Sequence, residues 1–201
     1  MKTKALLQTL LSLSTLLHAS SAEEIVEAPV EPELTPDQEL LKACMTGQGI
    51  DEVNDVKAAI AKGADVNTAG ENSGQSPFMA AVLRGKIGIA KYLHSVGADI
   101  TKGERSGYTA AHGAAFQGRV EMMQFLIEIG VDIHAAHEGD EFPPFIRTCW
   151  GKEERHAQTL QLLIDQGVDP TVVVNDNTCE EMTTNEHVKK VLAEYKRGSE
   201  L

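Results

Sequence analysis

Aromatic residues make up only 4% of the 201-residue chain, and its one tryptophan is Trp150. So few large rings favour thin helical layers packed with Ala, Leu and Val, in a chain long enough for one sizeable domain or two small ones. The chain contains no G-x-S-x-G, no P-loop and no G-x-G-x-x-G, so the sequence offers no motif for these enzyme classes. After residue 22 no stretch is long and apolar enough to span a bilayer, and we expect no membrane contact once a leader is removed.

Basic residues are also scarce, with 18 Lys and Arg against 30 Asp and Glu and a formal net charge of −12. Loss of a leader that carries Lys2 and Lys4 would leave 16 against 30, a net charge of −14. A strongly acidic surface disfavours nucleic acid and anionic lipid as partners. Solubility alone explains such a charge, and a basic protein partner explains it too, so the sequence leaves both interpretations open.

Residues 1–22 have the features of a secretory signal peptide. A positive start is followed by an apolar run from Leu6 to Leu17 and by small residues at Ser20-Ser21-Ala22, which predicts cleavage after Ala22. A signal anchor is the alternative, but it needs about 20 apolar residues. We therefore expect a protein of the secretory pathway, secreted or lumenal, or a periplasmic protein in a bacterium. Glu200-Leu201 matches only the last two residues of K-D-E-L, which leaves retention in the lumen open.

Residues 23–36 hold three prolines and five glutamates and little apolar content. This composition predicts an extended, disordered acidic linker, with a short recognition tail as the alternative. At its end, Thr35 is placed to cap a helix whose first residue is Pro36.

The rest of the chain repeats itself. The ending G-[AV]-D recurs at Gly63, Gly97, Gly130 and Gly167, with spacings of 34, 33 and 37 residues. Counted back from each closing glycine, the fourth, fifth and seventh positions are apolar and the sixth is polar. The fourth positions are Ala59, Leu93, Leu126 and Leu163; the fifth are Ala58, Tyr92, Phe125 and Leu162; the seventh are Val56, Ala90, Met123 and Leu160; the sixth are Lys57, Lys91, Gln124 and Gln161. This pattern predicts a helix with one apolar side, which must be buried by stacking on the neighbouring repeats. It also predicts that each closing glycine has a left-handed backbone conformation.

The segment Thr109-Ala110-Ala111-His112-Gly113-Ala114 keeps the Thr, His and Ala of the T-P-L-H-x-A motif, and the chain here resembles the ankyrin repeat family. Ser76-Pro77-Phe78-Met79-Ala80-Ala81 keeps the Pro and the Ala, whereas Phe142-Pro143-Pro144-Phe145-Ile146-Arg147 keeps only a Pro. The resemblance implies an all-α solenoid of stacked helix-turn-helix units, with about four repeats and a C-terminal capping half-repeat. The expected repeat domain is 37–197, with repeats at about 37–70, 71–104, 105–138 and 139–174 and a cap at 175–197.

The three cysteines form an odd set. Cys44 falls at a small apolar position of the first inner helix, which predicts an inert thiol in the core. Cys149 and Cys179 lie in adjacent repeats, and an oxidising compartment permits a disulfide between them. Whether their geometry fits one is left open by the sequence.

His134-Ala135-Ala136-His137-Glu138 with Asp140 is the one cluster of potential metal ligands. It falls in a loop and lacks the helical spacing of H-E-x-x-H, so we interpret it as a solvated polar loop and expect no cofactor. The resemblance gives His112 a hydrogen-bonding role within and between turns.

In the ankyrin family, the inner helices and the loop tips line a concave face that binds partners, and two positions before the mid-repeat glycine point to it. These positions are Leu83 and Arg84, Phe116 and Gln117, and Cys149 and Trp150. Phe116, Trp150 and the loop-tip residue Tyr108 are then predicted to form an aromatic row, with Arg84 and Arg105 beside it. Packing of Phe116 and Trp150 between repeats is the alternative.

Two functions follow as hypotheses. The first is a non-enzymatic, monomeric module that binds an unidentified protein partner through Leu83, Arg84, Arg105, Tyr108, Phe116, Gln117 and Trp150. A basic partner is one of the two interpretations that the acidic charge leaves open. The alternative is a small metal-dependent or thiol-based activity at the His134/His137 loop or at Cys149.

Overall fold

The computed structural model describes residues 33–46, 52–71, 73–104 and 107–199, nearly all within the compact unit Leu34–Leu201. In this part of the chain, helices account for all regular structure apart from an isolated bridge between Val174 and Asn177. The helices are α2 (Pro36–Thr46), α3 (Glu52–Ala61), α4 (Pro77–Arg84), α5 (Ile87–Ser95), α6 (Ala110–Phe116), α7 (Val120–Glu128), α8 (Pro144–Cys149), α9 (Glu154–Asp165), α10 (Cys179–Met182) and α11 (Glu186–Ser199). The fold is an all-α repeat solenoid, as predicted.

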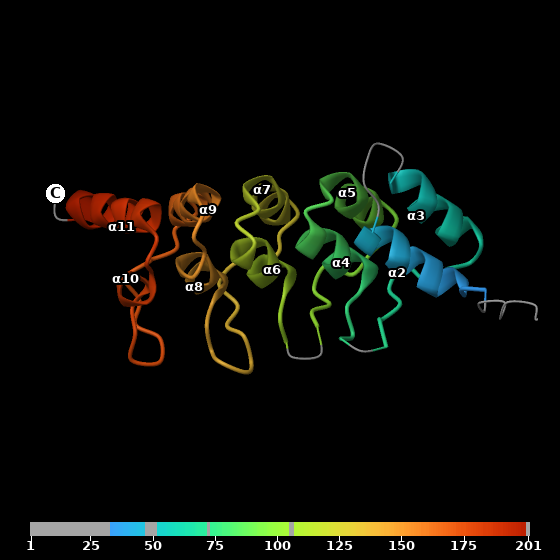
Figure 1. Ribbon diagram of the computed structural model, residues 1–201, viewed down its shortest axis with the longest axis horizontal. Coiled ribbons are helices and arrows are strands. Elements are labelled where there is room, and N and C mark those ends of the chain that lie inside the picture. Colours follow the sequence, from blue (N-terminus) through green and yellow to red (C-terminus); the bar gives the residue numbers. More distant parts are fainter. Residues whose placement is uncertain (1–32, 47–51, 72, 105–106, 200–201) are drawn as a thin grey trace, which may run out of the picture. The chain divides into compact units, whose positions relative to one another are not determined.

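Within this unit the helices form two rows (Figure 1). The inner row runs α2, α4, α6, α8 and α10, and each of these helices packs against the next. The outer row runs α3, α5, α7, α9 and α11. The loops project from the inner row on the side that faces away from the outer row. Each helix pair is therefore one repeat, and the hairpin-like loop before each inner helix belongs to the same face as that helix.

Local sequence sets where the inner helices begin. The Ser76 hydroxyl accepts from the Met79 amide at 3.2 Å, and Thr178 forms a capping box with Glu181. Thr35 accepts from the Gln38 amide at 3.3 Å, so α2 begins at Pro36 with Thr35 as its cap, as predicted. α8 lacks a side-chain cap and begins with Pro144 after Pro143, because the fourth repeat has no Ser or Thr at this point.

The closing glycines end the outer helices as the sequence predicts. All four have a positive φ, between 82° and 98°. In this region a side chain is penalised, so glycine is the residue that the turn requires.

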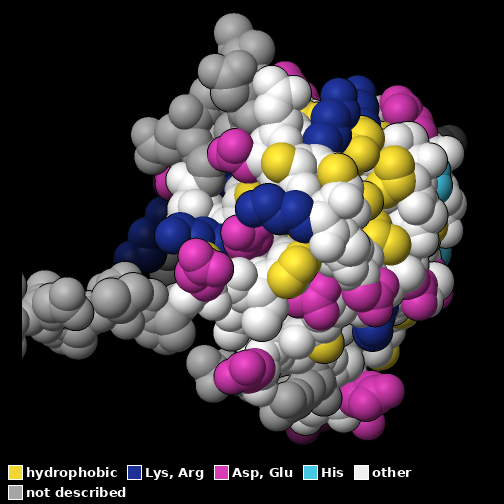
Figure 2. Space-filling model, turned by 90° about the vertical axis from the view of Figure 1, so that its right-hand side faces the viewer, with side chains coloured by type: hydrophobic (Ala, Val, Ile, Leu, Met, Phe, Trp, Pro, Cys, Tyr) yellow, Lys and Arg dark blue, Asp and Glu magenta, His cyan; other side chains and the backbone are white. Residues whose placement is uncertain are grey.

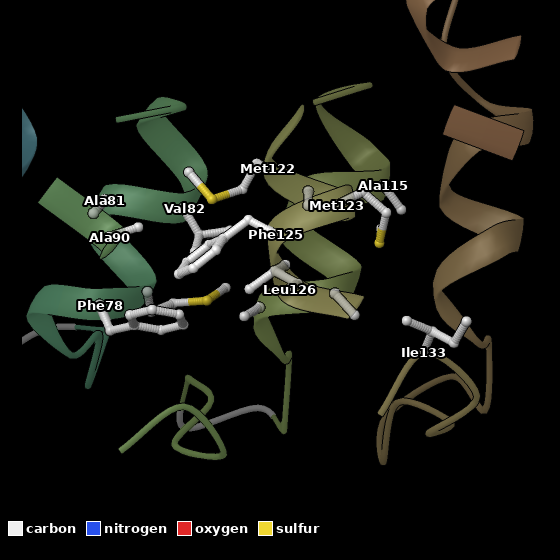
Figure 3. Packing of buried hydrophobic residues seen from close by; sticks show 14 of the residues in the cluster. Phe78, Ala81, Val82, Ala90, Ala115, Met122, Met123, Phe125, Leu126 and Ile133 are labelled. Carbon is white, nitrogen blue, oxygen red and sulfur yellow. The ribbon is translucent and has the colours of Figure 1, made fainter. Parts of the chain in front are cut away.

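The core lies between the two rows and continues from repeat to repeat. Side chains such as Met122, Phe125 and Leu126 point from α7 toward α4 and α5 of the preceding repeat (Figure 3). The fourth and seventh positions before each closing glycine are buried in every repeat. Stacking thus supplies the partner surface that a single helix pair lacks.

The fifth position departs from the prediction. Ala58 is exposed and Tyr92 and Leu162 are half-buried, whereas only Phe125 is buried. The position lies at the edge of the apolar side, where a lysine of the preceding repeat covers the ring. Lys57 Nζ lies 5.3 Å from the centroid of the Tyr92 ring, and Lys91 Nζ lies 5.7 Å from that of Phe125.

The first repeat ends the stack with a mixed surface. Figure 2 shows this end, where hydrophobic side chains are interspersed with Lys, Arg, Asp and Glu. Lys62 Nζ pairs with Glu39 at 2.6 Å across α2 and α3. A polar outer face of this kind is what a terminal repeat needs to meet water. In the described segments, no helix combines the length and the apolar character that crossing a membrane would demand.

Candidate protein-binding face

The C-terminal ends of the inner helices carry large apolar side chains that are exposed. Phe116 is 47% exposed and Trp150 is 39% exposed. Met45 lies at the equivalent position of α2 and is 38% exposed, and half-buried Leu83 is its counterpart on α4. We call these four residues, Met45, Leu83, Phe116 and Trp150, the apolar strip.

Met45 is a strip residue that the sequence interpretation missed. It lies two residues before Gly47, as Phe116 lies two before Gly118. The same count back from the mid-repeat glycine would have identified Met45, had it been applied to the divergent first repeat.

The other predicted face residues differ in their surroundings. Arg84 is exposed beside Leu83, and Gln117 is half-buried beside Phe116. Cys149 is fully buried, so the fourth repeat presents Trp150 alone. Arg105 lies outside the described residues.

Tyr108 is not a freely exposed loop-tip residue, because it packs into a cluster between the third and fourth repeats. Its hydroxyl donates to the backbone carbonyl of His112 at 3.2 Å. Its ring centroid lies 5.3 Å from that of His112 and 5.7 Å from that of His137. Burial raises the pKa of Tyr108 to about 12, so the phenol stays neutral.

Arg147 is the centre of this cluster, and only 4% of it is exposed. Its guanidinium carbon lies 4.9 Å from the Trp150 ring centroid, 5.3 Å from Tyr108 and 5.7 Å from Phe142. Its Nη2 donates to Asp140 Oδ1 at 2.8 Å. Cation–π contacts are strongest where the cation is desolvated, so Arg147 fixes the rings around it.

Asp140 joins the loop to this arginine. Its Oδ1 also accepts from His137 Nδ1 at 2.9 Å and from the Phe142 amide at 3.1 Å. Burial alone would raise the pKa of Asp140, but these hydrogen bonds and Arg147 outweigh it and hold the pKa below its usual value. The carboxylate is therefore the counter-charge of a buried arginine.

The sequence interpretation missed this cluster because Arg147, its central residue, occupies a position that holds a small residue in the preceding repeats. Arg147 lies four residues before Gly151, the position held by Ala81 and Ala114 in the preceding repeats. A charged residue at a buried position implies a partner, and this substitution is the signal from which the cluster could have been inferred.

His112 has the role that the resemblance implies. Its Nε2 donates to the Phe142 carbonyl of the next repeat at 2.9 Å, and its Nδ1 accepts from Thr109. Because the side chain is buried, the pKa of His112 is lowered to about 4.

Residues 40–137 match the family model of ankyrin repeats in three copies. The chain belongs to the ankyrin repeat family. The same helix-pair geometry continues past the match, through α8 to α11. The comparison with curated proteins gave no significant match. Ankyrin repeats are in general protein–protein interaction modules, and the family is typically non-enzymatic.

Three findings of this ankyrin repeat structure bear on the metal and thiol alternative. Cys149 is bonded to Cys179 in a disulfide, so no free thiol lies at the site predicted for one. The one free cysteine, Cys44, is buried, and burial raises its pKa to about 12, as expected for an inert core thiol. No group of three or more His, Cys, Asp or Glu residues is arranged to hold a metal ion in the described ranges.

The predicted solvated loop is right for His134 and wrong for His137. His134 is exposed, whereas only 13% of the His137 side chain is exposed. His137 is held inside by Asp140 and by the rings of Tyr108 and His112. The loop is therefore a packed link between repeats.

Proposed function

We propose that this protein is a non-enzymatic interaction module that binds a protein partner on the face made by the inner helices and the loop tips. The observation that carries the proposal is the exposure of Phe116 and Trp150, whereas most large apolar side chains in the described segments are buried or half-buried. Both lie at the C-terminal ends of successive inner helices. Exposed apolar residues gathered on one face are typical of an interaction site.

Trp150 is the expected anchor of the interface. Tryptophan, tyrosine and arginine most often dominate binding energy at interfaces. Arg147 and Phe142 already hold the Trp150 ring, whose centroid lies 5.5 Å from that of Phe142. A ring that is fixed before binding loses little conformational freedom on association, which favours affinity. Tyr108 contributes through Arg147, as a support for this anchor.

Leu83 and Arg84 on α4 and Gln117 after α6 are proposed to add contacts along the same row of inner helices. Arg105, which lies outside the described residues, is proposed to contribute as well. The acidic charge of the chain favours a basic partner, since opposite charges speed association and exclude like-charged competitors. The protein is proposed to act as a monomer.

The proposed compartment is the secretory pathway or a bacterial periplasm. The Cys149–Cys179 disulfide supports this, because such bonds persist in oxidising compartments and are rare in the cytosol. The pattern of residues 1–22, which lie outside the described part, points the same way.

The test is a pull-down from a native secretory or periplasmic extract with residues 23–201 as bait. A Phe116→Ala/Trp150→Ala variant and a Val96→Ala control run beside it. Val96 is 39% exposed at the end of α5, in the outer row, and so matches Trp150 in exposure but not in place. A partner retained by the control and lost by the double variant supports the proposal. A partner retained by both variants would move the site away from the strip.

Unfolding of the double variant completes this test. Because both side chains are far from fully buried, we expect it to lose about 2 kcal/mol or less of unfolding free energy, against about 3–5 kcal/mol for Phe78→Ala in the core. A loss as large as the Phe78→Ala value would identify Phe116 and Trp150 as core residues and overturn the proposal.

A further inference from the structure

We call the surface of the inner helices between the apolar strip and the loops the channel. The strip lies at the C-terminal ends of the inner helices, and the hairpin-like loops stand at their N-terminal ends. α4, α6 and α8 have eight, seven and six residues, which corresponds to lengths of about 9–12 Å. The strip and the loops are therefore separated by about the diameter of one α-helix with its side chains.

At the first repeat this channel is a hollow. Leu41 and Met45 of α2 line one side of it, and the loop residues Ala69, Gly70 and Ser73 line the other. Asp37, Gln38 and Lys42 of α2 line it too, so polar side chains border the apolar pair. The apolar side chains of Leu41 and Met45 therefore face a loop at the place where the strip begins.

The next three loops carry acidic side chains, and the last of them also carries exposed Val172 and Val173. Glu104, Glu138, Glu141 and Asp176 lie on these loops, and all but Glu104 are exposed. Lys102 is the basic residue of the described loop tips there, and its Nζ donates to the Asn67 carbonyl at 2.7 Å. A ligand that fills the channel would place its apolar side on the strip and its basic side toward the loops.

The spacing of the strip selects the shape of the ligand. Packed helices are about 8–10 Å apart, so strip residues of successive repeats recur at about that interval. An α-helix that lies along the row presents the same side every seven residues, or about 10.5 Å. A β-strand presents the same side every two residues, or about 6.6 Å, and falls out of step. A polyproline helix has a repeat of about 9.3 Å, but it is narrower than the channel.

We propose that the channel binds a basic amphipathic α-helix of a protein partner, which lies along the inner row and places one apolar residue every seven on the strip. This rests on the proposed function and names the partner chemistry of the same face. The strip spans three steps between repeats, so the helix has about 20 residues. Exposed Arg84 is the one cation beside the strip on α4, and it selects an acidic residue on the opposing turn.

The test uses a displayed library of random peptides of about 24 residues and the protein expressed from its complete sequence. Selection on the wild type is paired with counter-selection on Phe116→Ala/Trp150→Ala. The expected winners are rich in Lys and Arg and carry apolar residues at intervals of seven. A synthetic winner is then titrated while the emission of Trp150, the sole tryptophan, is followed. We expect its emission to shift to shorter wavelength as the ring is covered.

A register variant of that peptide is the matched control. Two residues inserted at its centre rotate the second half by about 200°, and we expect Kd to rise at least tenfold. Selected peptides that depend on the strip but are acidic, proline-rich or without a period of seven would contradict the proposed helical ligand. They would still support the proposed binding face. An unchanged Kd for the register variant would do the same. If no peptide distinguishes the wild type from the double variant, both the helix and the proposed function fail.

Discussion

At the scale of single residues, the aspartate in each G-[AV]-D ending shows why the pattern recurs. Asp65, Asp99, Asp132 and Asp169 each accept from the backbone amide two residues later, at 2.8 or 2.9 Å. The same geometry at four positions fixes the chain as it leaves the outer helix. Hydrogen bonds from Thr101 and Thr171 lower the pKa of Asp99 and of Asp169.

His112 makes stability depend on pH. Its pKa is about 4 in the folded protein and near 6.5 in an unfolded chain, because burial disfavours the charged ring by more than the hydrogen bond to the Phe142 carbonyl favours it. Between these values the unfolded chain binds a proton that the folded protein does not, so stability falls as the pH falls. We expect the unfolding free energy to drop by about 2 kcal/mol from pH 7 to pH 5.

Denaturant titrations between pH 4.5 and 7 measure this slope, with His112→Gln as the comparison. The variant keeps the other six histidines, so a shallower slope isolates the contribution of His112. Equal slopes for the wild type and the variant would show that His112 does not carry the effect.

Gly151 is required by close packing. A Cβ at this residue would lie 1.9–2.4 Å from ring atoms of His156, whose Nε2 donates to the Phe116 carbonyl at 3.2 Å. We expect Gly151→Ala to lower the unfolding free energy by about 2–3 kcal/mol, because the displaced ring breaks this link between repeats. In Gly88→Ala the new Cβ meets only Val53 at 3.7 Å within α5, so thermal unfolding should show no loss or a gain of up to about 1 kcal/mol. Similar losses in the two variants would contradict the packing argument.

At the scale of elements, the disulfide secures the short last repeat. Cys149 ends α8 and Cys179 begins α10, a helix of only four residues. The sequence placed the two cysteines in adjacent repeats but could not show whether their backbones approach. Their Cα atoms lie 5.5 Å apart, which is within the range of a disulfide.

Removal of this bond should loosen the C-terminal cap. The bond closes a loop with a sequence separation of 30, for which the chain-entropy model gives about 3–4 kcal/mol. We expect Cys149→Ser/Cys179→Ser to lower the melting temperature and to increase amide exchange in α10 and α11 before α4 to α7. Adding a reductant to this variant should change nothing further. Uniform exchange along all repeats would argue against a local role for the bond.

The helices could be predicted from the sequence because each repeat supports the same pattern in the others. The closing glycines and the fourth and seventh positions were identified correctly, since they depend only on helix period and turn conformation. The fifth position and Tyr108 were not, because their burial depends on neighbours in adjacent repeats, such as Lys57 above Tyr92. Arg147 at a small buried position signalled that a partner exists, but the identity of its partners depends on contacts between repeats.

At the scale of the whole molecule, repetition produces both the core and the face. Stacking buries the apolar sides of successive helix pairs, and it aligns Met45, Leu83, Phe116 and Trp150 at one end of the inner row. Phe116 and Trp150 were predicted as face residues from their sequence distance to the mid-repeat glycine. It could not show that Arg147 and Phe142 hold Trp150 in place, because that support comes from the folded loop.

Amide hydrogen exchange of the protein, alone and with the partner recovered by the pull-down, tests most directly that the inner-helix face is the binding face. The account predicts slower exchange at the C-terminal ends of α4, α6 and α8 and in the loops before α6 and α8. Protection confined to the outer helices α5, α7 and α9 would contradict it.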